Sequence, residues 1–207
     1  MRTIFIGVLL VLSTFAQAQV GNNLGLLDPN LAERAELLSL PNVNDKIADS
    51  IIAARPIATT GELDSVLSAS LNDEEKTAVF TKLFRQIDLN HADDDTIMLI
   101  PGMTKRMAHE FEEYRPYTSL EQFRREMSKY VDDEEVARLE QYVFIPMELN
   151  SASDDALMTI PGMTKRMAHE FEEYRPYTSL DQFRREIGKY VDDNEVSRLE
   201  SYIYLQN

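Results

Sequence analysis

The chain has 207 residues, with 21 lysines and arginines against 36 aspartates and glutamates, and a formal net charge of −15 at pH 7. Such an acidic balance argues against broad, non-specific binding to nucleic acid, which depends on neutralising phosphate, although a local basic patch is compatible with it. The sequence contains no cysteine, which excludes disulfides, thiol catalysis and cysteine-bound zinc.

The stretch 1–18 has the layout of a secretory signal peptide. Arg2 gives a basic start, an apolar run follows, and Ala16 and Ala18 place small residues before a cut at Gln19. The apolar run has about 13 residues, whereas a helix that crosses a bilayer needs about 20. We therefore expect residues 1–18 to be removed, and the mature chain to be periplasmic or secreted and without a membrane span.

Two segments of equal length, 88–147 and 148–207, align without a gap. Residues 100–120 read IPGMTKRMAHEFEEYRPYTSL and recur unchanged at 160–180. A divergent third copy at 28–87 keeps several landmarks at the same step, namely Asn30, Asn90 and Asn150; Pro41, Pro101 and Pro161; and the Arg-Pro pairs that begin at Arg55, Arg115 and Arg175. A fixed period predicts a repeat architecture, with units at 19–87, 88–147 and 148–207.

The first two helices of the second segment are indicated by their caps and stops. Asp93 is a suitable N-cap, as is its counterpart Ser153, and the helix that follows ends at the Pro-Gly of 101–102. Thr104 caps the next helix, in which apolar residues recur at helical spacing up to Tyr114. The Arg-Pro pair at 115–116 ends this helix, because the residue before proline is pushed out of the α region.

Two further helices complete the segment. Ser119 with Gln122, and Asp132 with Glu135, have the spacing of a capping box. No stretch alternates for long as a strand does, so the expected fold is all-α, with about four short helices in each unit. The joints at 84–90 and 145–150 contain no run of glycine and serine, which favours close packing of the units.

Residues 100–108, IPGMTKRMA, resemble the helix-hairpin-helix motif, whose pattern is Leu-Pro-Gly-hydrophobic-Gly, two further residues and Ala. The longer stretch 88–123 is similar to the domain of the ComEA competence family. The resemblance extends over all three units and implies three tandem helix-hairpin-helix units. A weaker similarity connects the unit with the extrinsic subunit U of photosystem II, a protein-docking piece.

In DNA-binding members of this family, the hairpin presents backbone amides and a nearby cation to a phosphate. The resemblance therefore implies a phosphate site in the second and third units, formed by Gly102, Met103, Thr104, Lys105 and Arg106 and by Gly162, Met163, Thr164, Lys165 and Arg166. Threonine stands where the family has its second glycine. Its hydroxyl either bonds a phosphate or caps the helix.

Other hairpins in the chain lack these features. In the first unit Asn42 and Asn44 replace both glycines and Asp45 replaces the lysine, so this hairpin is not expected to bind an anion well. The second hairpin expected of a paired motif lies near 129–133 and 189–193. It has no glycine signature, and its acids would repel phosphate.

The remaining charged residues favour structural roles. Arg124, Arg125, Arg184 and Arg185 have acids at helical spacing, in Glu121, Glu126, Asp181 and Glu186. The acids at 93–95 fit a capped helix start rather than a calcium loop. The three histidines, His91, His109 and His169, have no metal-ligand spacing, and no catalytic or cofactor motif appears. We expect no metal, no cofactor and no enzyme activity.

Two functions from different classes follow. The first is non-catalytic binding of the DNA backbone without sequence specificity, as in ComEA-like DNA uptake, with DNA as the partner. The second is a protein–protein interaction scaffold in which the hairpins are purely structural. The family resemblance and the basic pairs favour DNA, whereas the acidic charge and the missing second glycine favour the scaffold.

Overall fold

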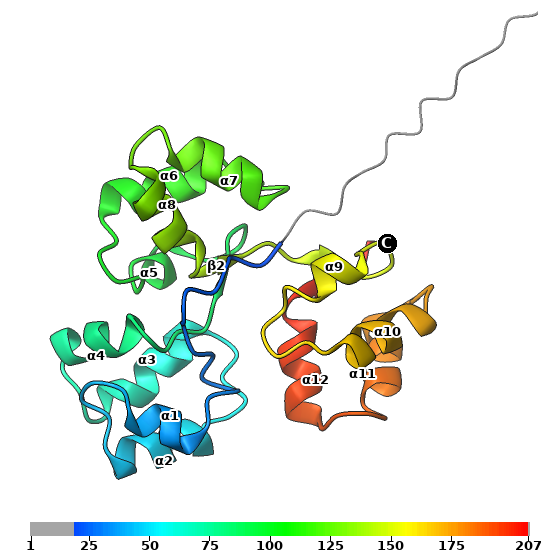
Figure 1. Cartoon of the computed structure of the whole chain (residues 1–207), viewed down its shortest axis with the longest axis horizontal. Coiled ribbons are helices and arrows are strands. Elements are labelled where there is room, and N and C mark those ends of the chain that lie inside the picture. The colour runs from blue at the N-terminus through cyan, green and yellow to red at the C-terminus, as the bar shows by residue number, and fades with distance from the viewer. Residues whose placement is uncertain (1–18, 207) are drawn as a thin grey trace, which may run out of the picture.

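The computed structural model describes residues 19–206, so the expected signal peptide lies outside the described residues. Within this range the chain is mostly helical, with twelve short helices and four two-residue strands (Figure 1). None of the described helices is both long and apolar enough to cross a bilayer. The largely helical class expected from the sequence is therefore confirmed.

The helices fall into three groups of four, which appear as three lobes in Figure 1. The first segment (28–87) holds α1 (Arg34–Leu38), α2 (Asp45–Ala53), α3 (Thr60–Ser68) and α4 (Asp73–Phe80). The second segment (88–147) holds α5 (Asp94–Ile97), α6 (Lys105–Glu113), α7 (Leu120–Met127) and α8 (Asp133–Glu140). The third segment (148–207) holds α9 (Asp154–Leu157), α10 (Lys165–Glu173), α11 (Leu180–Ile187) and α12 (Asp193–Glu200). Each segment thus repeats the same order of helices at the same positions.

The predicted caps of the second segment are the observed ones. Asp93, Thr104, Ser119 and Asp132 are the N-caps of α5 to α8, and each side chain accepts a hydrogen bond from a backbone N–H of its helix. The two capping boxes are only half formed. The Gln122 side chain accepts from the N–H of Thr118 instead, and the Glu135 carboxylate pairs with Arg138.

Four very short strands were not predicted. β1 (Ile87–Asp88) pairs in parallel with β2 (Val143–Phe144), and β3 (Met147–Glu148) pairs in parallel with β4 (Ile203–Tyr204). An isolated parallel bridge joins Leu27 to Leu83, at the equivalent place in the first segment. Each pair ties the start of a segment to its end. Two residues are too few to produce the alternation by which a strand is recognised in sequence.

The asparagine and arginine that recur in every segment stabilise the loops between helices. The Asn90 side chain accepts from the N–H of Tyr117 at 2.7 Å and donates to its carbonyl at 2.9 Å. Arg115 donates to the carbonyls of Leu89 and Ala92, at 2.8 and 2.7 Å. The same bonds recur around Asn30 and Arg55, and around Asn150 and Arg175. These landmarks therefore have a structural explanation.

The first two segments share one hydrophobic core, in the way that close packing of the units requires. One hydrophobic cluster runs through the first two segments, from Leu26 to Ile145. A second cluster fills the third segment and includes Val20 and Phe144 from outside it. At the two joints the ring centres of Phe84 and Tyr142 lie 4.9 Å apart, and the ring centres of Phe144 and Tyr202 lie 4.6 Å apart.

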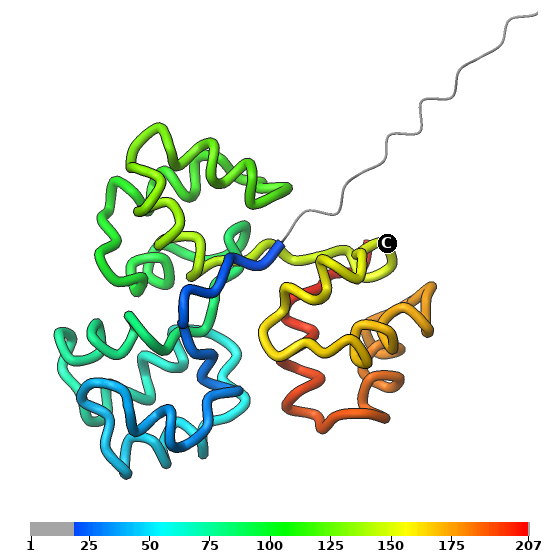
Figure 2. The backbone as a smooth tube through the Cα atoms, viewed as in Figure 1, coloured from blue at the N-terminus to red at the C-terminus, as the bar shows by residue number. Residues whose placement is uncertain are grey.

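The stretch that precedes the first segment crosses the junction between the lobes, as the blue start of the tube shows (Figure 2). Here the chain pairs with β2 in antiparallel fashion, through a bridge between Val20 and Phe144. The N–H of Gly21 donates to the carbonyl of Val143 at 3.0 Å, and the N–H of Ile145 donates to the carbonyl of Gln19 at 2.7 Å. The start of the described chain thus contacts the end of the second segment.

Candidate phosphate-binding hairpins

The turn between α5 and α6 depends on one residue with a positive φ. Gly102 has φ +76° and its copy Gly162 has φ +74°. Residues with a Cβ rarely adopt this region, which glycine enters freely. In the first segment the same position is Asn42, with φ +62°, and asparagine is among the few other residues that tolerate it. The glycine recognised in the motif thus occupies a left-handed backbone position, which asparagine occupies in the first segment.

Threonine at the second glycine position acts as a helix cap. Thr104 has φ −114°, and its hydroxyl oxygen accepts from the N–H of Met107 at 3.2 Å. Thr164 makes the same bond to Met167, also at 3.2 Å. Because φ is negative here, the backbone does not require glycine. Of the two roles considered for this hydroxyl, capping is the one that the structure contains.

Not every backbone amide of the predicted site is free to meet an anion. The N–H of Met103 donates to the carbonyl of Ile100 at 2.9 Å, and its side chain is buried beneath the turn. Met163 is placed in the same way. Among the described residues, no acceptor is recorded for the backbone N–H of Gly102, Thr104, Lys105 or Arg106, nor for Gly162, Thr164, Lys165 or Arg166. The available donors therefore lie on both sides of the methionine rather than on it.

The basic pairs stand in the first turn of their helices. Lys105 and Arg106 are exposed, as are Lys165 and Arg166. In the part of the chain that the structure describes, α6 and α10 are the two helices without an acid in the first turn. The helix dipole disfavours a cation at this end. A bound anion would therefore offset the unfavourable interaction of these lysines and arginines with the dipole.

Neither lysine of these pairs has a recorded ion-pair partner among the described residues. The guanidinium of Arg106 lies 5.9 Å from the centre of the Tyr130 ring, and Arg166 lies at the same distance from Tyr190. A contact of this kind orients the arginine but leaves its charge uncompensated. The positive charge at the start of α6 and α10 is therefore available to a ligand.

The glutamates behind the basic pair differ in how far their charge is compensated. Glu112 pairs with Arg115 at 3.3 Å. Glu113 lies 3.7 Å from the imidazole of His109, an attraction that operates when the histidine is protonated. Glu110 is buried. Glu112 is thus compensated by Arg115, whereas one carboxylate oxygen of Glu110 has no hydrogen-bond partner among the described residues.

The first-segment hairpin has a different charge pattern. Asp45 opens α2, and Arg34 pairs with it at 2.6 Å and with Asp49 at 3.0 Å. The N-cap is Asn44, which accepts from the N–H of Ile47. This helix start is already occupied by acids, in line with the expectation that it binds no anion well.

The two glycine hairpins differ in their surroundings. A Cβ placed on Gly162 would lie 2.9 Å from a methyl carbon of Leu31, so the third-segment hairpin abuts the first segment. A Cβ on Gly102 would meet Arg138 at 3.5 Å. Arg138 also donates to the carbonyl of Pro101 at 2.7 Å. The hairpin of the second segment also lies beside the first, since Gly102 and Met103 line a small pocket with Asp64 and Asp73.

The arginines on α7 and α11 pair with acids, as expected, but some of their partners were missed. Arg124 donates two hydrogen bonds of 2.5 and 2.8 Å to the Glu140 carboxylate on α8. Arg184 donates two hydrogen bonds to Glu200 in the same way. Arg125, Arg184 and Arg185 do pair with the predicted acids Glu126, Asp181 and Glu186. These arginines are compensated and do not extend a basic strip.

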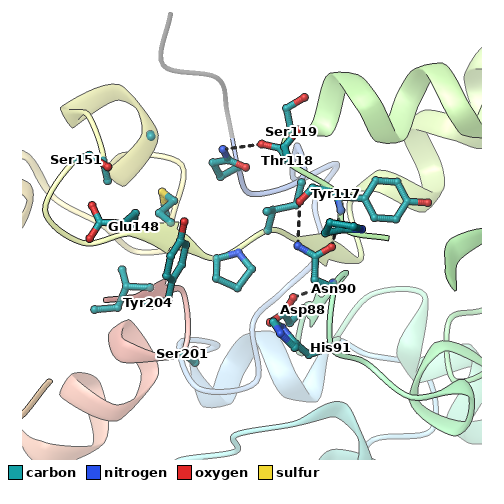
Figure 3. Close-up of a pocket in the computed structure, with 18 of the residues that line it drawn as sticks. Asp88, Asn90, His91, Tyr117, Thr118, Ser119, Glu148, Ser151, Ser201 and Tyr204 are labelled. Carbon is teal, nitrogen blue, oxygen red and sulfur yellow. Dashed lines mark hydrogen bonds and ion pairs between the residues drawn. The ribbon is translucent and has the colours of Figure 1, made fainter. Parts of the chain in front are cut away.

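A groove of about 1190 Å³ lies between the second and third segments (Figure 3). Asp88, Glu148 and Glu200 contribute acids to its lining, and Tyr204 forms part of one wall. Among the described residues, no lysine or arginine lines it. Although burial opposes it, hydrogen bonds from Ser151 and from nearby backbone N–H groups hold the pKa of Glu148 below its usual value. No sequence pattern indicated this groove, because its walls come from residues far apart in the chain.

Within residues 19–206 no group of three His, Asp or Glu side chains is placed to hold a metal ion. Comparison of the chain with protein-family models, with curated proteins and with solved structures gives no match.

Proposed function

We propose that the chain is an exported, non-catalytic protein of three tandem helix-hairpin-helix units of the ComEA type, and that it binds the DNA backbone without sequence specificity. The hairpins of the second and third units carry this function. The observation that supports it best is the pair of helices α6 and α10, which begin with exposed, uncompensated cations and free backbone amides.

A phosphate at such a helix start would accept from several N–H groups at once and would meet the positive end of the helix dipole. Lys105 and Lys165 would add charge, and the exposed Arg106 and Arg166 would lie beside them. Contacts of this kind hold the protein on the backbone and read no base sequence.

The alternative is a protein–protein scaffold in which the hairpins are purely structural. The acidic groove between the second and third segments favours it, as does the hairpin of Gly162, which packs on Leu31. In this alternative the partner is a protein with basic or polar groups that enter the groove, and DNA is not bound.

Fluorescence anisotropy separates the two. Residues 19–207 are titrated against labelled duplex and single-stranded DNA at low and moderate salt. Binding should be saturable and should weaken with salt with a shallow log–log slope, corresponding to about two to four phosphates at roughly 0.9 each. The double variant Lys105→Glu and Lys165→Glu should abolish it.

The matched control is Lys46→Glu with Lys82→Glu, which changes the net charge equally at exposed lysines outside the two glycine hairpins. This control should retain most of the binding. Equal losses in both double variants would mean that only total charge matters, and absence of binding at low salt would remove DNA as the ligand.

A further inference from the structure

The outer edge of β2 is covered by the chain itself. Residues 19–21 run along it, with Gly21 donating to the carbonyl of Val143 and Ile145 donating to the carbonyl of Gln19. The side chain of Val20 is buried in the core of the third segment. The structure thus shows how an extended peptide binds the outer edge of β2, the strand that ends the second segment.

β4 is the counterpart of β2 in the third segment. Its inner edge repeats the bonds of β2: Met147 donates to Tyr202 at 2.9 Å, as Ile87 donates to Tyr142 at 2.9 Å. Its outer edge differs. Among the described residues, no partner is recorded for the carbonyl of Ile203 or the N–H of Leu205, the groups that correspond to those of Val143 and Ile145.

The side chains of β4 are exposed accordingly. Tyr204 is 46% exposed, whereas Phe144 at the equivalent position is 4% exposed. Leu205 is partly exposed, and its counterpart Ile145 is buried. An unpaired edge with exposed large side chains is a ready template for another strand.

We propose that the outer edge of β4 is a docking site for an extended segment of a partner protein, in which an apolar residue is followed by glycine. The segment would run antiparallel to β4 and form the two bonds that residues 19–21 form with β2. This is recognition by strand addition, in which main-chain bonds give affinity and side-chain fit gives specificity. It does not depend on whether the hairpins bind DNA.

The partner segment needs glycine at this position because the backbone of Gly21 lies close to the end of α8. A Cβ on Gly21 would overlap the carbonyl oxygen of Glu140, at the last residue of α8. The equivalent carbonyl beside β4 belongs to Glu200, at the last residue of α12. A residue larger than glycine at this position of the partner would therefore collide with the helix end.

The same contact argues against a second copy of this chain as the occupant. If two β4 strands paired antiparallel about Tyr204, Leu205 of each would fall at the glycine position. If residues 19–21 of a second copy bound β4 of the first, the outer edge of β2 in that second copy would lose its own pairing. Among the described residues of each copy, residues 19–21 are one covering segment for the two edges of β2 and β4, so the partner must bring a segment of its own.

The test is a nuclear magnetic resonance titration of residues 19–207 with the synthetic peptide Gln-Val-Gly-Asn-Asn, the sequence of 19–23, at millimolar concentration. The Leu205 amide should shift and should exchange with solvent at least tenfold more slowly, while the Ile145 amide stays unchanged. The peptide Gln-Val-Val-Asn-Asn should have no effect.

Two variants complete the design. Leu205→Pro, which lacks the donating N–H, should lose the response at Tyr204, whereas Leu205→Ala should keep it. Absence of a response, a response at Ile145 in place of Leu205, or equal binding of the valine peptide would overturn the proposal. So would a dimer of the unliganded chain that Leu205→Pro converts to monomer, since a second copy would then cover the edge. Lys105→Glu with Lys165→Glu should leave peptide binding intact, which separates this test from that of DNA binding.

Discussion

The guanidinium carbon of Arg85 lies 4.7 Å from the centre of the Tyr202 ring, and the arginine also donates to the Tyr202 hydroxyl. Ser201 accepts a further bond from Arg85, and Asp28 pairs with it at 3.4 Å. Arg85 is 1% exposed, and burial raises the pKa of Tyr202. A buried cation is stable only with such partners. The contact ties the end of the first segment to the end of the third.

Replacing Tyr202 by Phe should destabilise the protein by about 1.5–3 kcal/mol, the usual worth of a hydrogen bond to a charged group. The guanidinium of Arg85 would lose one acceptor in a buried site. Urea unfolding measures the change. Tyr204→Phe is the control, because its hydroxyl is on an exposed residue and surface substitutions usually stay within about 0.5 kcal/mol. Equal effects of the two changes would show that the buried contact contributes nothing.

Replacing each of the two hairpin glycines by alanine should lower the free energy of unfolding by different amounts. Gly102→Ala forces a Cβ into a left-handed conformation, at about 1–2 kcal/mol. Gly162→Ala should cost more, because its Cβ would also lie 2.9 Å from Leu31. Thermal unfolding of both variants under identical conditions gives the order. A larger loss at Gly102 would contradict the contact with Leu31.

The substitution Lys105→Glu should stabilise the protein while it weakens DNA binding. An acid in the first turn of α6 favours the helix dipole that the lysine opposes, so the free energy of unfolding should rise by about 0.3–1 kcal/mol. Lys105→Gln should give a smaller gain. Denaturant unfolding and the anisotropy titration are measured on the same variants. A loss of stability with Lys105→Glu would mean that the lysine has a structural contact of its own.

Stability should fall as the pH drops below about 4.5. Hydrogen bonds from Lys129 lower the pKa of Glu126 from its ordinary 4.5, and Lys189 does the same for Glu186. A carboxyl whose pKa is lower in the folded state stabilises the protein above the ordinary value, and this contribution is lost as the pH falls through the folded value. Melting temperatures from pH 6 to pH 2 measure it.

The variant Lys129→Met with Lys189→Met should show a shallower acid decline, because both carboxyls then titrate nearer their ordinary value. Arg125→Met is a weaker control, since Arg125 also bonds Glu126 but is the smaller cause. An unchanged slope in the lysine variant would place the acid sensitivity in other carboxyls.

The local features of the fold could be predicted because neighbouring residues decide them. Asp93, Thr104, Ser119 and Asp132 cap their helices through bonds to the first turn of the same helix. The reciprocal half of each predicted box was wrong: the Gln122 side chain accepts from the N–H of Thr118, and the Glu135 carboxylate pairs with Arg138. The repeated landmarks were visible in sequence, but their roles were not.

Contacts between distant residues left no pattern to recognise. In the sequence nothing distinguishes Arg85 from a surface arginine. Its contact with Tyr202 forms only when the first and third segments pack together. At the candidate site, the exposed Lys105 could be predicted from its place in the first turn. The engaged amide of Met103 could not, because its bond to Ile100 depends on the shape of the turn.

The parallel pairing of β1 with β2, and of β3 with β4, brings the first and last residues of a segment side by side. The chain therefore enters and leaves each lobe at one point. A further copy of the segment can be added at that point without stretching or redirecting the lobes already present. Gene duplication at such a joint lengthens the protein by one lobe, and the closely similar second and third segments are the outcome to be expected of it.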